Sequence, residues 1–98
     1  MAKNPYKGDR FTVAAKQAGF PARSVFKLEE IDKRTRILRP GMNVLDLGAA
    51  PGSWSMYAAD RIGRNGRLLA MDLNPLGCEL PANATFMLGD ALSLDNAA

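Results

Sequence analysis

Residues 42–55 read M-N-V-L-D-L-G-A-A-P-G-S-W-S, and this stretch decides the fold. An apolar run leads into a turn with two glycines, and the turn leads into a segment with helical spacing. This order predicts a strand, a tight turn and a helix whose N-terminus faces a ligand. We expect Gly48 to let the chain leave the strand sharply and Gly52 to let a ligand lie against bare backbone. The pattern G-x-x-x-G alone is also compatible with an ordinary strand-to-helix turn.

The flanking sequence predicts an α/β fold with a mostly parallel sheet. We expect helices over residues 9–18, with Asp9 as the N-cap, over residues 22–36, and over residues 53–62. Strands are expected over residues 42–48, 67–73 and 85–88, with a loop over residues 76–84 and the start of another helix after residue 90. The run V-L-D-L at residues 44–47 suggests a strand buried inside the sheet.

Polar or glycine residues fall at the ends of all three predicted strands, namely Gly48, Asp72 and Asp90. In parallel sheets these ends lie on one side, where ligands bind. A carboxylate at Asp72 can accept both hydroxyls of a ribose, or it can cap the turn before Asn74. Asp90 can bind the amino group of an adenine, or cap a following helix. Taken together, the three positions predict a nucleoside-shaped site.

The turn argues against a dinucleotide. Ala50 stands where the nicotinamide fingerprint G-x-G-x-x-G has its second glycine, and Pro51 removes an amide that a diphosphate would need. Trp54 at the helix N-terminus either packs as a core residue or lines the site, and we favour contact with the ligand through its backbone amide.

Composition excludes several classes of site. The 98 residues contain no histidine, and Cys78 is the single cysteine, so a histidine base, a disulfide framework and a thiolate metal cluster are excluded, and we expect no metal. No apolar run approaches the roughly 18 residues of a membrane span, and no secretory signal is visible. These features favour the cytoplasm and no membrane partner.

Charge is unevenly distributed. Residues 1–39 contain ten basic and four acidic residues, a net charge of +6, whereas residues 40–98 contain three basic and six acidic residues, a net charge of −3. A basic segment joined to an acidic body indicates a polyanionic partner, although a solvated helix explains the charge equally well. Lys27 lies at the edge of the apolar face of its helix. An ion pair with Glu30 on the helix surface would be enough to explain a lysine at this position.

Four motifs together resemble the FtsJ/RlmE family of ribosomal RNA 2′-O-ribose methyltransferases. They are A-R-S-V-F-K-L-E-E-I-D at residues 22–32, R-P-G-M-N-V-L-D-L-G-A-A-P-G-S-W-S at 39–55, G-R-L-L-A-M-D-L-N-P at 66–75 and F-M-L-G-D at 86–90. The resemblance extends over residues 15–90. No single motif is specific, but their combination and order are.

The resemblance implies a Rossmann-like methyltransferase that uses S-adenosylmethionine to methylate a ribose, that of a uridine, in 23S ribosomal RNA of the large ribosomal subunit. It places Gly48, Gly52 and Trp54 along the methionine and sugar, Asp72 at the ribose and Asp90 at the adenine. Lys27 becomes the first member of a catalytic Lys-Asp-Lys-Glu set, with Arg23 beside it on the RNA. Residues 1–40 would form a basic, RNA-contacting segment and residues 41–98 the donor-binding half-domain.

This sequence departs from the family pattern in three ways, one of which is a slightly longer loop between Asp72 and Asp90. Ser53 occupies a position that is often glycine, and the family sheet has about seven strands, with the other catalytic residues in its second half. We therefore expect an N-terminal part with little turnover alone, whose first strand pairs with a C-terminal half. The alternatives are a methyltransferase for tRNA or an mRNA cap, and a non-catalytic module that binds the donor or RNA.

Overall fold

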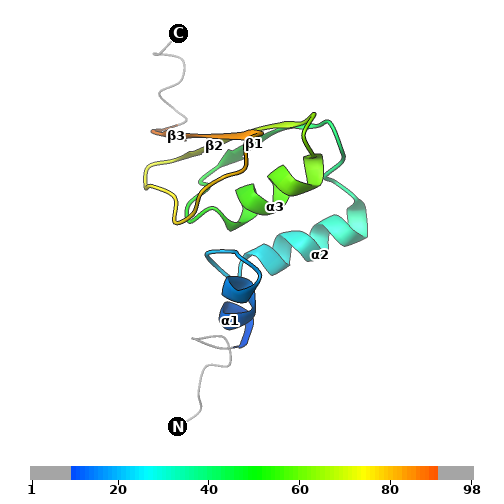
Figure 1. The fold of residues 1–98 in the computed structure, drawn as a ribbon, viewed down its shortest axis with the longest axis vertical. Coiled ribbons are helices and arrows are strands. Elements are labelled where there is room, and N and C mark those ends of the chain that lie inside the picture. Colours follow the sequence, from blue (N-terminus) through cyan, green and yellow to red (C-terminus); the bar gives the residue numbers. More distant parts are fainter. Residues whose placement is uncertain (1–9, 91–98) are drawn as a thin grey trace.

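The computed structural model describes residues 10–90, which form three helices and three strands (Figure 1). In chain order these are α1 (Arg10–Gln17), α2 (Val25–Thr35), β1 (Asn43–Leu47), α3 (Ser53–Ile62), β2 (Arg67–Asp72) and β3 (Ala84–Leu88). The α/β prediction is confirmed. The predicted cap at Asp9 and the predicted helix after residue 90 lie outside the described residues.

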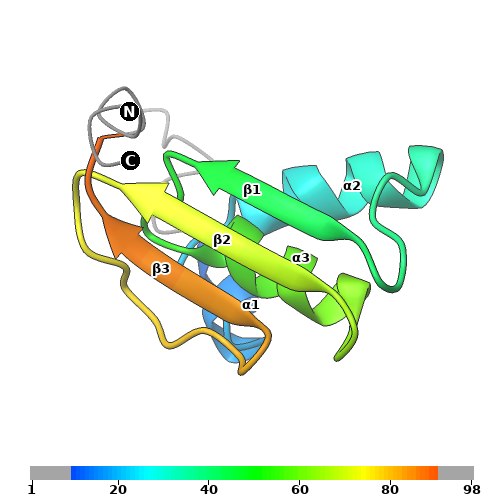
Figure 2. The same cartoon turned by 90° about the horizontal axis from the view of Figure 1, so that it is seen from above.

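The three strands form one parallel sheet in the order β1-β2-β3. Leu45 pairs with Leu69, which pairs with Thr85, so the carboxyl ends of the strands lie side by side. Helix α3 packs against one face of the sheet, and α2 lies on the far side of α3 (Figures 1 and 2). This arrangement leaves the strand ends accessible at one edge of the molecule.

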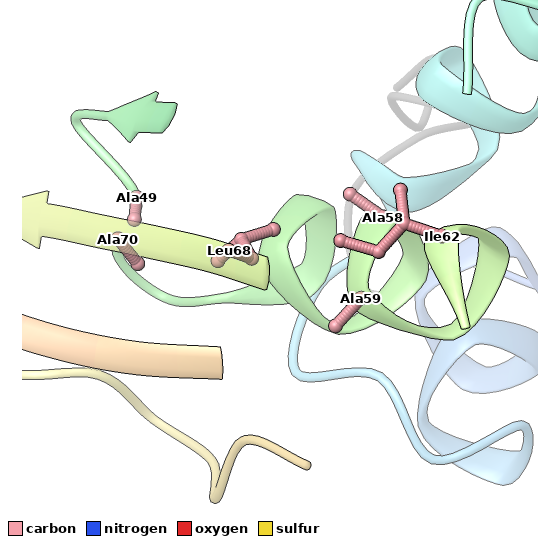
Figure 3. Packing of buried hydrophobic residues seen from close by; sticks show 6 residues of the cluster. All are labelled: Ala49, Ala58, Ala59, Ile62, Leu68 and Ala70. Atoms are coloured by element: carbon pink, nitrogen blue, oxygen red, sulfur yellow. The ribbon is translucent and has the colours of Figure 1, made fainter. Parts of the chain in front are cut away.

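The core lies between α3 and the sheet (Figure 3). Ile62 and Ala70 are completely buried, and the remaining members of the cluster are Ala49, Ala58, Ala59 and Leu68. The i, i+4 spacing of Ala58 and Ile62 places both on the face of α3 that meets β2. Because most of these side chains are small, the helix approaches the sheet closely, and the turn between β1 and α3 is held in a fixed position.

A buried carboxylate joins α2 to α3. Asp32 is 2% exposed, and it accepts hydrogen bonds from the Leu38 N–H (2.9 Å), the Tyr57 hydroxyl (3.1 Å) and the Arg61 guanidinium (3.1 Å). Burial by itself raises the pKa of Asp32, but these donors outweigh burial and hold the pKa below its ordinary value. The same burial and the Asp32 charge raise the pKa of Tyr57. Asp32 therefore fixes how α2 lies along α3.

Two predicted features differ in the structure. Helix α2 begins at Val25 rather than residue 22, because residues 22–24 form a turn that hydrogen-bonds to α3. The prediction that the first strand is buried is wrong for the described residues. β1 is an edge strand in which Leu45 and Leu47 are 54% and 53% exposed, since no described element covers their face.

Candidate functional site

The three strand-end residues meet in one place. A cavity of about 220 Å³ lies over the carboxyl ends of the strands, and Gly48, Asp72 and Asp90 all line it. Leu47, Met71 and Leu73 form its apolar wall. The sequence prediction that these residues converge is confirmed, and the site combines two carboxylates with an apolar surface suited to a flat ring.

The turn after β1 folds back on the end of β2. Gly48 has a φ of 74°, a left-handed conformation that favours glycine. Its N–H and that of Ala49 both donate to the carbonyl of Met71, at 2.8 and 3.0 Å. The Ala50 N–H donates to Oδ2 of Asp72 at 2.9 Å. Gly48 thus turns the chain at the strand end as predicted, and Asp72 holds the turn in place.

This hydrogen bonding occupies the N–H groups in the first part of the turn. The N–H groups of Gly48, Ala49 and Ala50 are all used within the protein, and Pro51 has none. A diphosphate at this kind of turn requires N–H groups that point at the ligand. For residues 48–51, the geometry supports the sequence argument against a dinucleotide.

Asp72 has two structural roles in addition to any ligand role. Its Oδ1 accepts a hydrogen bond from the Asn74 N–H at 2.8 Å, which is the turn-capping alternative that the sequence left open. The N–H groups of Asn74 and Ala50 lower the pKa of Asp72, so the group is ionised at neutral pH. Each carboxylate oxygen has a further lone pair, and Asp72 can still accept hydroxyl donors.

A second cavity of about 310 Å³ adjoins the first through Leu47 and Gly48, which line both. Asp46, Ser24 and Trp54 also line it. Oδ2 of Asp46 accepts a hydrogen bond from the Ser55 hydroxyl at 2.6 Å, and Oδ1 has no hydrogen-bond partner within residues 10–90. Asp46 is therefore a carboxylate able to bind a positively charged group.

The reason for glycine at position 52 differs from the sequence expectation. Gly52 has a φ of 116° and precedes α3, and a Cβ there would lie 2.6 Å from Sγ of Cys78. The Gly77 N–H also donates to the carbonyl of Pro51 at 2.8 Å. The loop of residues 76–78 therefore occupies the space beside Gly52. Contact between Gly52 and a ligand stays a prediction.

Trp54 uses its side chain in an unexpected way. Its indole N–H donates to the carbonyl of Ser24 at 2.8 Å, and the residue is 38% exposed. The alternative of a core tryptophan is therefore wrong. The predicted contact through its backbone amide stays a prediction, although Trp54 lines the second cavity.

Lys27 lies in the first turn of α2 and Arg23 in the turn before that helix, on either side of Ser24, which lines this cavity. Both are exposed. The Lys27 N–H donates to the carbonyl of Ser24 at 3.1 Å, which begins the helix. Glu30 pairs with Arg34 rather than with Lys27, at 3.8 Å, and the Lys27 ammonium has no ion-pair partner within residues 10–90. The ion pair between Lys27 and Glu30 that the sequence suggested as an alternative is therefore not formed.

Sequence reasoning did not assign roles to Ser24 or to the Ser53 hydroxyl. Their contacts join segments about 30 residues apart, and no local pattern indicates them. Within the described residues no group of histidine, cysteine and acidic side chains is arranged to hold a metal ion. No helix among residues 10–90 is long and apolar enough to cross a membrane.

Sequence comparison decides the family. The profile of the FtsJ-like methyltransferases matches residues 20–98. The chain belongs to the FtsJ-like methyltransferase family. It is 68% identical over 97 residues to the ribosomal RNA large subunit methyltransferase E of Sorangium cellulosum. The matched region covers 98% of this chain and 46% of that protein.

Two further relatives have the same name. The protein of Desulfatibacillum aliphaticivorans is 56% identical over 88% of this chain and 42% of its own length. The protein of Bdellovibrio bacteriovorus is 50% identical over 97% of this chain and 47% of its own length. This FtsJ-like chain thus spans about half the length of the curated relatives it matches.

Proposed function

We propose that this FtsJ-like chain forms the donor-binding half of an S-adenosylmethionine-dependent 2′-O-methyltransferase that acts on a ribose, that of a uridine, in the RNA of the large ribosomal subunit. One observation carries the proposal. Gly48, Asp72 and Asp90 line one cavity over the ends of three parallel strands, in a chain that belongs to a methyltransferase family. The relatives' names support the RNA substrate.

The two adjoining cavities fit the parts of S-adenosylmethionine. The smaller one offers carboxylates at Asp72 and Asp90 and an apolar wall, which suit ribose hydroxyls and an adenine. The larger one offers Asp46, whose Oδ1 suits an ammonium group. The donor contains no phosphate, which agrees with a turn in which the N–H groups of Gly48, Ala49 and Ala50 are used within the protein and Pro51 has none.

When bound, S-adenosylmethionine supplies a methyl group activated by a positive sulfur. Asp72 and Asp90 orient the nucleoside, and the rigid turn fixes its position relative to α2. Lys27 would hold the acceptor 2′-hydroxyl, and its positive charge would stabilise the negative charge that develops on the oxygen as the proton passes to water. Orientation of the two reactants supplies much of the rate enhancement. Arg23 and the basic residues of the N-terminal segment contact the RNA phosphates, so binding should weaken with salt.

The rest of the enzyme would pair with the exposed edge of β1. Leu45 and Leu47 present an apolar surface on the uncovered face beside that edge, and the relatives have about as many residues again outside the matched region. The 98-residue chain alone is then expected to bind the donor weakly and to turn over little or not at all.

A chimera tests the proposal. Residues 1–98 are continued into the remaining residues of the Sorangium cellulosum relative and incubated with labelled S-adenosylmethionine and large ribosomal subunits, tRNA or capped mRNA. We expect label on a uridine ribose of the large-subunit RNA. Label on tRNA or a cap alone would replace the proposed substrate, and donor binding without label on any RNA would favour a non-catalytic module.

A further inference from the structure

Three side-chain hydrogen bonds join the turn before α2 to the first two residues of α3. The Ala22 N–H donates to Oγ of Ser53 at 2.8 Å, and the Ser53 hydroxyl donates back to the Ala22 carbonyl at 3.1 Å. The Trp54 indole N–H donates to the Ser24 carbonyl at 2.8 Å. Ser53 is 1% exposed, so its hydroxyl is fully satisfied by one distant backbone residue.

The Ser24 carbonyl connects these contacts to Lys27. It accepts the Trp54 indole N–H and also the backbone N–H of Lys27, at 3.1 Å. Arg23 lies between the two residues that α3 holds, Ala22 and Ser24. The N-terminus of α3 therefore fixes the backbone on both sides of Arg23 and at the helix turn that carries Lys27.

The turn between β1 and α3, which leads into Ser53 and Trp54, is held from another side. Residues 76–78 pack on it through the Gly77–Pro51 hydrogen bond and the close approach of Cys78 to Gly52. Contacts on both sides therefore hold the start of α3, and residues 22–24, which bond to it, set the distance between Lys27 and the larger cavity. Ser24, Ser53 and Trp54 all line that cavity.

We propose that Ser53 and Trp54 are positioning residues, which hold Arg23 and Lys27 at the donor turn so that the acceptor ribose meets the methyl group. This inference rests on the proposed function. A glycine at position 53, the residue expected from the family resemblance, has no hydroxyl and cannot make either contact with Ala22. Both contacts with Ala22 therefore require serine at position 53. The hydrogen bond from the Trp54 indole to Ser24 holds the same segment independently of Ser53.

The test uses the chimera described above and the substitutions Ser53→Ala, Ser53→Gly and Trp54→Phe. The dissociation constant for S-adenosylmethionine and the kcat/KM for the RNA are measured well below the melting temperature of each variant. Each variant loses one or two of the hydrogen bonds that hold residues 22–24, where the RNA is proposed to bind. The kcat/KM for the RNA is therefore expected to fall about tenfold. Donor affinity is expected to fall less than kcat/KM, because the strand-end residues are untouched and Trp54→Phe keeps the backbone amide at position 54.

The control is Thr35→Ala, which removes an exposed hydroxyl bonded within α2 itself. It should leave both constants unchanged. Active Ser53→Ala and Trp54→Phe chimeras with unchanged kcat/KM, or with equal losses of donor affinity and kcat/KM, would overturn the positioning role. An unmodified chimera that neither binds the donor nor methylates RNA would instead overturn the proposed function on which this inference rests.

Discussion

The carboxylate of Asp72 accepts the N–H of Ala50 at 2.9 Å, and so joins the end of β2 to the turn that follows β1. The same side chain lines the cavity over the strand ends. One residue thereby supports the turn between β1 and α3 and offers acceptors to a ligand. A substitution here should disturb both, whereas a substitution at Lys27 should disturb neither.

Asp72→Ala is expected to weaken binding of S-adenosylmethionine about 10- to 100-fold, because charge-assisted hydrogen bonds to the ribose and the support of the turn are lost together. Titration calorimetry on the chimera measures this. Asp60→Ala, an exposed carboxylate on α3, is the matched control and should bind normally. Equal affinities for Asp72→Ala and the unmodified protein would exclude Asp72 from the donor site.

Lys27→Ala should leave the donor dissociation constant unchanged and lower kcat of the chimera about 100-fold, as expected when one group that stabilises developing charge is removed. Lys33→Ala provides the comparison, since Lys33 is an exposed lysine of the same helix that pairs with Glu29 at 3.3 Å. Single-turnover assays with labelled donor report the rate. An undiminished rate for Lys27→Ala would remove this lysine from the mechanism.

Asp32→Ala should destabilise the 98-residue chain by about 3 kcal/mol, since it leaves the Leu38 N–H, the Tyr57 hydroxyl and Arg61 without their buried acceptor. Such a loss is a large part of the stability of a small domain. Urea unfolding followed by circular dichroism measures it. Asp60→Ala should change stability by less than about 0.5 kcal/mol, and a similar small effect at Asp32 would refute the anchoring role.

Stability should also fall in acid. The pKa of Asp32 is lowered in the folded chain from its ordinary value of 3.8, so its contribution is complete above that value and is lost as the pH falls through the lowered pKa. The urea concentration at the midpoint of unfolding should therefore be independent of pH near about pH 6 and should decrease below about pH 4. Asp32→Asn should show a shallower decline. Identical acid profiles for the two proteins would assign the decline to other carboxylates.

The 98-residue chain should self-associate through the exposed edge and face of β1, because unpaired strand edges beside apolar side chains promote pairing between chains. Leu45→Lys should suppress the association in sedimentation experiments across a range of concentrations. Ile37→Lys, which changes an equally exposed residue outside the sheet (54%), should not. Association that both substitutions suppress equally would point to general apolar contact rather than to this edge.

Local patterns predicted much of the fold. The bounds of α3 match the prediction, since Gly52 and Gly63 mark both ends, and the three strands lie within two residues of their predicted limits. The convergence of Gly48, Asp72 and Asp90 followed from the geometry of parallel strands alone. These features depend on short-range propensity and on sheet topology, both of which are readable from one sequence.

The contacts between distant segments were not predictable. Nothing near Ser53 indicates that its hydroxyl meets Ala22, and nothing near Trp54 indicates that its indole reaches Ser24. The burial of β1 was misjudged because the apolar run V-L-D-L indicates burial without indicating which element provides it. The role of Cys78 beside Gly52 likewise depends on packing between segments 26 residues apart in the sequence.

Binding of the methyl donor tests the central claim most directly. S-adenosylmethionine is titrated into the chimera by calorimetry, with NAD titrated in parallel. The account predicts one donor site per chain, no measurable binding of NAD, and loss of affinity in Asp72→Ala but not in Asp60→Ala. A folded chimera that takes up no S-adenosylmethionine, or that binds NAD equally well, would contradict it.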